Sequence, residues 1–163
     1  MSLEQDVTGG AGGAAMGGGS GASGGAADSE LTWSDSSAGY LSVTSNATGG
    51  AGGATDTGAA GAGGLATASA SATSSTADEV YSTASVTGGA GGQTTEGGTA
   101  GAGASEAYNG STNPVTAVGT STNYGYVSVT ASATPMAARR ASRPSTPTAH
   151  WAFTRSAAQP ATN

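Results

Sequence analysis

The hexapeptide Thr-Gly-Gly-Ala-Gly-Gly occurs three times in this chain of 163 residues, at 8–13, 48–53 and 87–92. Consecutive copies are 40 and 39 residues apart. A constant period of this length is typical of repeat architectures, in which a unit that cannot bury its apolar face alone stacks on its neighbours. The sequence therefore predicts a lead at 1–7, repeats at 8–47, 48–86 and 87–133, and a tail at 135–163.

Each predicted repeat closes with a segment in which apolar or small residues alternate with polar or aromatic ones. These segments are 40–47, 79–86 and 126–133, and each is followed by Thr. A period of two is typical of a β-strand with one buried face and one solvated face. Stacked strands of this kind would share a thin core between units.

Large apolar side chains are scarce, since Leu, Ile, Val and Phe together number 13, against 30 Gly and 35 Ala. The fraction of large apolar residues is therefore well below about 20%, the fraction under which an ordinary hydrophobic core is not expected. The predicted fold class is therefore an all-β, low-complexity repeat array without an ordinary globular core. Stacked strands in a β-solenoid-like arrangement and substantial disorder carry equal weight.

The glycine runs have three interpretations. They could be turns that need a positive φ, extended segments like polyglycine II or polyproline II packed side by side, or flexible linkers. The residues alone leave all three open.

Charge is segregated along the chain, whose formal net charge is −6. All ten acidic residues lie between Glu4 and Glu106, and there is no Lys. The four basic residues are in the tail: Arg139, Arg140, Arg143 and Arg155. An acidic body repels phosphate, so we expect no nucleic-acid partner for it.

No Cys is present, which excludes disulfides and thiolate metal sites. No stretch of 18 apolar residues predicts a membrane span. The first residues lack the basic and apolar regions of a signal peptide. The residues themselves therefore leave the localisation open.

The tail begins where a fourth hexapeptide is due, at Thr134, and contains no Gly from there to Asn163. A natural linker rich in Pro and Arg is one explanation. A slip of the reading frame in a GC-rich gene is the explanation that we favour. Either way, 135–163 is expected to be disordered or foreign to the repeats.

No motif predicts catalysis, a cofactor or a metal. The G-x-G-x-x-G pattern at 19–24 lacks the flanking strand and helix that bind a pyrophosphate. Asp56 has no equivalent in the other repeats, unlike the Asp of calcium-binding repeats. Asn46 and Asn109 begin sequons that are expected by chance, and His150 stands alone. We therefore expect a protein that is not an enzyme.

Two groups of side chains could form a surface. Thr44, Thr83 and Thr130 occupy equivalent positions in the repeats and form a candidate surface row. The aromatic residues of the body could stack on sugars or form a cross-strand ladder, but capping of the core is favoured. They are Trp33, Tyr40, Tyr81, Tyr108, Tyr124 and Tyr126.

Residues 8–134 resemble the Gly/Ala/Ser/Thr-rich repeats of bacterial secreted or cell-surface proteins, in which such hexapeptides alternate with strands like Tyr126–Thr134. The Gly-Gly-Ala-Gly-Gly element is also loosely similar to mycobacterial PE-PGRS repeats. The resemblance implies an extracellular or cell-surface location, a structural role and no catalytic residues.

The first functional hypothesis is a structural or interaction segment, such as a stalk, matrix spacer or adhesive repeat. The second is an ice-binding module, or another module that binds through a repetitive surface. The third is a truncated fragment without independent function. Self-association through strand edges is the one partner interaction that the pattern favours.

Overall fold

The computed structural model describes residues 1–104 and 114–136, together with the backbone of 151–156. Within these ranges the secondary structure consists of strands, with no helix. The strands are β1 (Ser2–Thr8), β2 (Ala27–Asp35), β3 (Tyr40–Thr48), β4 (Ala66–Ser74), β5 (Glu79–Thr87), β6 (Val115–Ser121), β7 (Tyr126–Thr134) and β8 (Trp151–Ser156).

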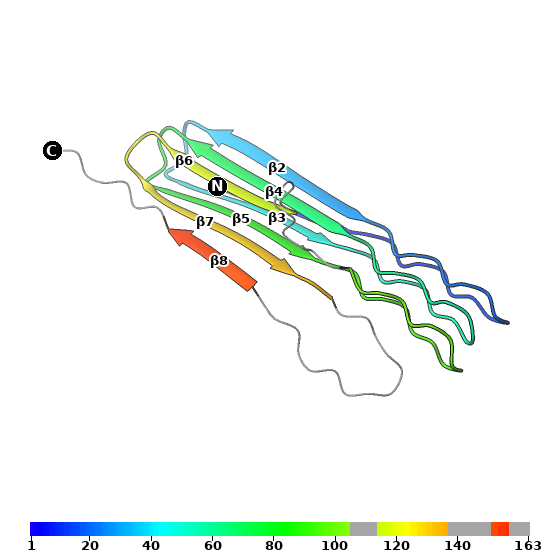
Figure 1. Cartoon of the computed structure of the whole chain (residues 1–163). Helices are drawn as coiled ribbons and strands as arrows, with labels where there is room; N and C mark the ends of the chain where they lie inside the picture. The colour runs from blue at the N-terminus through cyan, green and yellow to red at the C-terminus, as the bar shows by residue number, and fades with distance from the viewer. Residues whose placement is uncertain (105–113, 137–150, 157–163) are drawn as a thin grey trace.

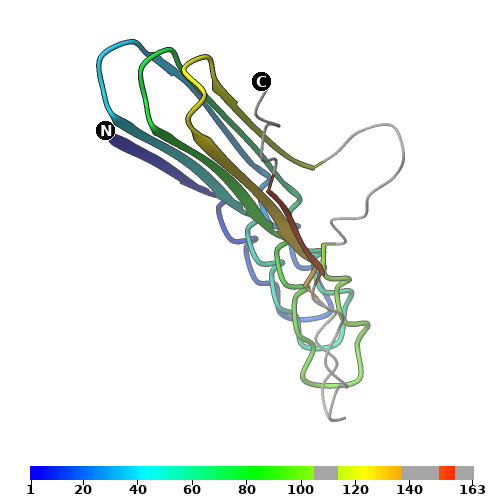
Figure 2. The ribbon, with the colours of Figure 1, turned by 90° about the vertical axis from the view of Figure 1, so that its left-hand side faces the viewer.

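The strands form two facing sheets (Figures 1 and 2). Sheet A has the order β1-β3-β5-β7-β8 and sheet B the order β2-β4-β6. All neighbouring strands are parallel except β7 and β8. The chain therefore passes from sheet A to sheet B and back, and we call each such circuit a coil: β1 with β2, β3 with β4, and β5 with β6.

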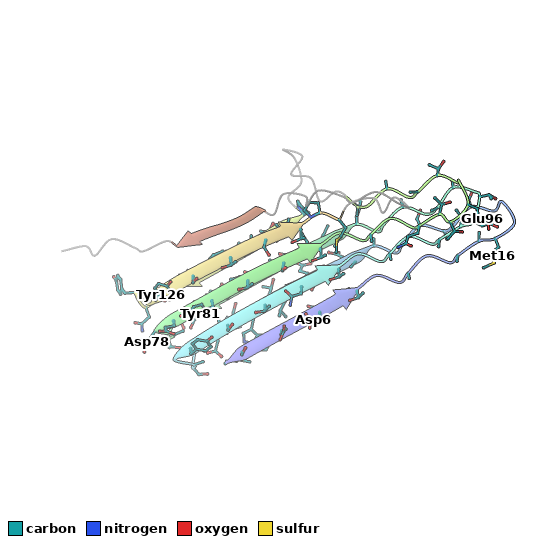
Figure 3. The ribbon with its side chains drawn as sticks, turned by 90° about the horizontal axis from the view of Figure 1, so that it is seen from below. Asp6, Met16, Asp78, Tyr81, Glu96 and Tyr126 are labelled. Carbon is teal, nitrogen blue, oxygen red and sulfur yellow. The ribbon has the colours of Figure 1, made fainter. Side chains whose placement is uncertain are left out.

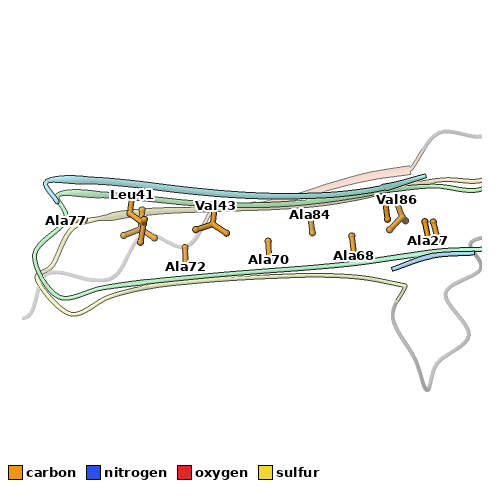
Figure 4. Close-up of a cluster of buried hydrophobic side chains, with 12 residues drawn as sticks. Ala27, Leu41, Val43, Ala68, Ala70, Ala72, Ala77, Ala84 and Val86 are labelled. Carbon is orange, nitrogen blue, oxygen red and sulfur yellow. The ribbon is translucent and has the colours of Figure 1, made fainter. Parts of the chain in front are cut away.

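Side chains along each strand point alternately into the space between the sheets and out to solvent. Leu41, Val80 and Val127 lie in register on β3, β5 and β7, and the first two are fully buried. The buried cluster has twelve residues, eight of them alanines (Figure 4). Because the period is two, a slip of one residue would turn this set towards solvent, so the apolar pattern fixes the register.

The core also contains hydroxyl groups that bond across it. Ser45 Oγ of sheet A donates to the carbonyl oxygen of Ser29 in sheet B, at 2.9 Å. Ser82 Oγ donates to the carbonyl oxygen of Ala70, at 3.0 Å. A serine can reach the opposite backbone only where the sheets lie close together, which the small side chains permit.

At one end of the sheets, short turns connect sheet B to sheet A. The last residue of each sheet B strand accepts backbone N–H bonds from its turn: Asp35 Oδ1 from Ala38, Ser74 Oγ from Ala77 and Ser121 Oγ from Gly125. The three capping residues are register partners. Polar side chains at this place therefore fix the turns.

At the other end, each coil extends into a glycine-rich arm that runs out and back (Figures 1 and 2). We call 9–26, 49–65 and 88–104 the first, second and third arm. The N–H groups of Gly9, Gly12 and Ala15 donate to the second arm or its start, at 2.8–2.9 Å. This spacing of three residues is that of a polyproline II-type helix, which has three residues per turn and no internal hydrogen bonds.

Close approach of backbones explains the glycines of the arms. A Cβ on Gly53 would lie 2.7 Å from the carbonyl carbon of Gly13, closer than real Cβ contacts. Positive φ values occur at Gly17, Gly18 and Gly97 among the described glycines. The runs are therefore packed, extended segments over most of their length, with a turn that uses positive φ at Gly17 and Gly18 near the tip of the first arm.

The predicted fold class is wrong. It gave substantial disorder equal weight, whereas the described residues form an ordered pair of sheets with a buried core. The label all-β is also incomplete, because the arms are hydrogen-bonded without being strands. Disorder was expected because Ala, Ser and Gly have side chains too small to form an ordinary core. In the structure, backbone hydrogen bonds between coils hold these residues in place.

The predicted tail contributes β8, which pairs antiparallel with β7. Residues 137–150 and 157–163 lie outside the described residues, so the prediction of a disordered or frame-slipped tail stays a prediction. None of the described segments is a helix with the length and apolar character needed to cross a bilayer.

Candidate functional site: the outer face of sheet A

The predicted threonine row lies on the outer face of sheet A. Thr44 is the register partner of Thr83, and Thr83 is that of Thr130. The three side chains alternate with inward positions of β3, β5 and β7, so they point away from the core. The structure therefore brings together the three candidate residues of the sequence, one from each of three neighbouring strands.

A second threonine row runs parallel to the first and was missed in the sequence. Its members are register partners at the ends of the four parallel strands of sheet A: Thr8, Thr48, Thr87 and Thr134. The signal was available, because the hexapeptide opens with Thr and this Thr lies four residues after Thr44 and its equivalents. An even separation along a strand puts both residues on the same face.

The two threonine rows enclose a third polar row, formed by Asn46, Ser85 and Ser132. Ser132 Oγ donates to Ser85 Oγ at 3.2 Å. Neighbouring strands lie about 4.8 Å apart, and alternate residues of one strand about 6.6 Å apart. The face therefore presents a two-dimensional array of hydroxyl and amide groups.

The first coil interrupts this array with charge. Glu4 and Asp6 of β1 occupy the rows of Thr44 and Asn46. Asn46 Nδ2 donates to Asp6 Oδ1 at 2.7 Å and to Glu4 Oε1 at 3.3 Å. The amide of this sequon is therefore engaged with two carboxylates, and the edge of sheet A is acidic.

Tyrosines cover the end of the same face remote from the arms (Figure 3). The ring centroids of Tyr40 and Tyr81 are 5.5 Å apart, and those of Tyr81 and Tyr126 are 5.9 Å apart. Partial desolvation and neighbouring Glu79 raise the pKa of Tyr81. These rings form a cross-strand ladder on the outer face, so the prediction that they cap the core is wrong for them.

Asp56 lies at the tip of the second arm and joins it to the first. Its carboxylate accepts backbone N–H bonds from Thr57 and Gly17 at 2.7 Å and from Gly18 at 3.2 Å. These three donors, Thr57 first, lower its pKa to about 2. Because backbone donors engage both oxygens, the side chain is a structural link between tips.

The remaining candidate motifs either take part in backbone hydrogen bonds between arms or lie outside the described residues. In the pattern at 19–24, the N–H groups of Gly21 and Gly24 donate to the second arm. Asn109 and His150, together with the side chains of the tail arginines, lie outside the described residues. Among the residues with described side chains, no group of three potential metal ligands is present.

No protein-family model, curated protein sequence or solved structure matches this chain. The arrangement of the chain's own side chains is therefore what indicates a function. The outer face of sheet A is the strongest candidate, because it repeats the same polar groups from coil to coil.

Proposed function

We propose that this protein is a non-catalytic structural or interaction segment, such as an adhesive repeat, matrix spacer or surface stalk. The observation that supports the proposal is the register of Thr44, Thr83 and Thr130 across neighbouring strands. Identical groups at a fixed spacing fit a partner that is itself repetitive. Many weak contacts then add up through multivalency.

An extracellular or cell-surface location accompanies this proposal. It follows from the resemblance of the glycine-rich repeats to those of bacterial surface proteins. The lack of Cys and the abundance of Gly, Ala, Ser and Thr are compatible with it.

Ice is the second candidate partner. The threonine register favours it, because a row of Thr offers a methyl group and a hydroxyl group at each strand, which suits an ordered lattice of water. Acidic residues at Glu4 and Asp6 restrict the regular area to β3, β5 and β7.

The test compares two lysine variants of central strands. Thr83→Lys places a long cation in the middle of the outer face of sheet A. Thr73→Lys is the matched control, since Thr73 is an outward residue of the central strand of sheet B. Both purified variants are checked for unchanged melting by circular dichroism.

Co-sedimentation with chitin, cellulose and peptidoglycan particles measures adhesion, and freezing-point hysteresis measures ice binding. We expect retention on one of these surfaces that Thr83→Lys weakens and Thr73→Lys leaves unchanged. Equal behaviour of the two variants, or no retention on any surface, would contradict the role of this face. Purely colligative freezing depression would remove ice as the partner.

A further inference from the structure

We propose that the open side of the first arm is a docking surface for a glycine-rich arm of another polypeptide chain. The surface consists of the backbone of 9–26 on the side that faces away from the second arm. It lies at the arm end of the molecule, remote from the tyrosine ladder (Figure 3). The inference goes beyond the proposed function and does not depend on the threonine face.

The glycine pattern of the first arm points to this contact. In the second arm, Gly50 and Gly53 are buried against the carbonyl groups of Gly10 and Gly13. The equivalent residues of the first arm are Gly10 and Gly13 themselves, which are exposed and have open space where a Cβ would lie. Neither has a positive φ. Contacts within the chain would thus tolerate side chains at these two positions, whereas an arm docked on this side would require glycine.

Three backbone groups on this side, the N–H groups of Gly10 and Gly13 and the carbonyl oxygen of Ala11, have no partner among the described residues. In the second arm, Gly50 and Gly53 donate N–H bonds to the first arm, at 2.8–2.9 Å. The equivalent N–H groups of Gly10 and Gly13 donate to no residue that the structure describes. The carbonyl oxygen of Ala51 accepts from the first arm, whereas the equivalent oxygen of Ala11 accepts from no described residue.

The contacts of the second arm with the first and with the third arm indicate what a docking arm must look like. In both, one arm donates N–H bonds from every third residue, as Gly52 and Thr55 do to the third arm. With a rise of about 3.1 Å per residue, such donors recur about every 9 Å. A docking arm therefore needs glycine at this spacing and the same extended conformation.

Two features disfavour a second copy of this chain as the occupant. Contact between two first coils would bring together carboxylates on β1 and β2, namely Glu4, Asp6, Asp28 and Glu30. Stacking of a first coil on the C-terminal end of another copy would meet β8, which already pairs with β7. These features favour the arm of a different glycine-rich chain over a second copy as the occupant.

Titration of the full-length, isotope-labelled protein tests the proposal. The probe is a synthetic peptide with the sequence of 87–104, and the control is a peptide of the same composition with its glycines out of the three-residue spacing. We expect saturable amide shifts at Gly10, Ala11, Gly13 and Ala14 with the first peptide alone. The double variant Gly10→Val/Gly13→Val should bind about tenfold more weakly or worse, because both side chains would occupy the space of the docked backbone.

Ala11→Val is the matched control variant. Ala51, its equivalent in the second arm, is exposed although an arm lies on each side, so this position points to solvent. The variant should bind like the wild type, and all variants should melt like it. Shifts elsewhere, no shift up to the solubility limit, or unchanged binding by the double variant would overturn the proposal. Concentration-dependent self-association of the protein through these residues would overturn the choice of partner.

Discussion

Gly50 of the second arm packs against the carbonyl group of Gly10 in the first. A Cβ on Gly50 would lie 2.7 Å from the carbonyl carbon of Gly10 and closer still to its oxygen. Gly10 has the same place in the repeat, but nothing lies within 4 Å of its own Cβ position. The same residue type at the same position therefore has different structural consequences in two consecutive coils.

Gly50→Ala should destabilise the protein by about 1–3 kcal/mol, because the added methyl group forces the two arms apart. Gly10→Ala should be neutral or slightly stabilising, since alanine lowers the entropy of the unfolded chain. Thermal unfolding followed by circular dichroism measures both. Equal melting temperatures of the two variants would mean that the arms are not packed as described.

Asp56 should make the link between the first two arm tips sensitive to acid. Its folded pKa of about 2 lies below the ordinary value of 3.8. A depressed pKa gives stability that is present above the unfolded value and lost as pH falls towards the folded value. We therefore expect the amide protons of Gly17 and Gly18 to lose protection between about pH 4 and pH 2.

Asp56→Asn should lower that protection at neutral pH and remove its dependence on acid. Hydrogen exchange followed by NMR resolves the two glycines. Glu96→Gln, near the tip of the third arm, is the control, because it removes one carboxylate but keeps the backbone N–H that Glu96 donates to the carbonyl oxygen of Asp56. An acid transition that persists unchanged in Asp56→Asn would assign it to another group.

Gly119 of β6 makes room for valines of sheet A. A Cβ there would lie 2.7 Å from Val127 Cγ1 and 3.0 Å from Val129 Cγ2. Gly119→Ala should therefore cost about 1–3 kcal/mol by overpacking. In a Val127→Ala background the cost should fall by about 0.5 kcal/mol or more, because the closer of the two methyl groups, Val127 Cγ1, is gone. Denaturant unfolding of the four proteins measures the coupling, and additive effects would contradict it.

Glu79 should contribute to the raised pKa of Tyr81. Tyr81 donates its hydroxyl proton to Glu79 Oε2 at 3.3 Å, and the carboxylate opposes formation of a second negative charge. Glu79→Gln should lower the pKa of Tyr81 only in part, because desolvation is the larger cause. Alkaline absorbance titration measures the change, with Tyr81→Phe to assign the signal. Identical curves for wild type and Glu79→Gln would refute the contribution of the carboxylate.

Some of the surface could be predicted from the residues. Thr44, Thr83 and Thr130 each lie four residues before the Thr that follows a closing segment, which placed them at equivalent positions, and alternation placed them on one face. The second row, from Thr8 to Thr134, could have been found by the same parity argument. The role of Asp56 could not, because its donors at Gly17 and Gly18 are 39 and 38 residues away and carry no side-chain signal.

The sequence by itself determined the repeat period, the direction of side chains along each strand and the separation of acidic and basic residues. The tertiary structure decided whether the chain is ordered, because neither Ala68 nor Gly53 has an apolar side chain large enough to form a core alone. Ala68 is buried by the close approach of a second sheet, and Gly53 by an arm that lies 40 residues earlier. The ordered state depends on backbone hydrogen bonds and on packing contacts between coils. The strength of these contacts depends on interatomic distances, which cannot be read from the amino-acid composition.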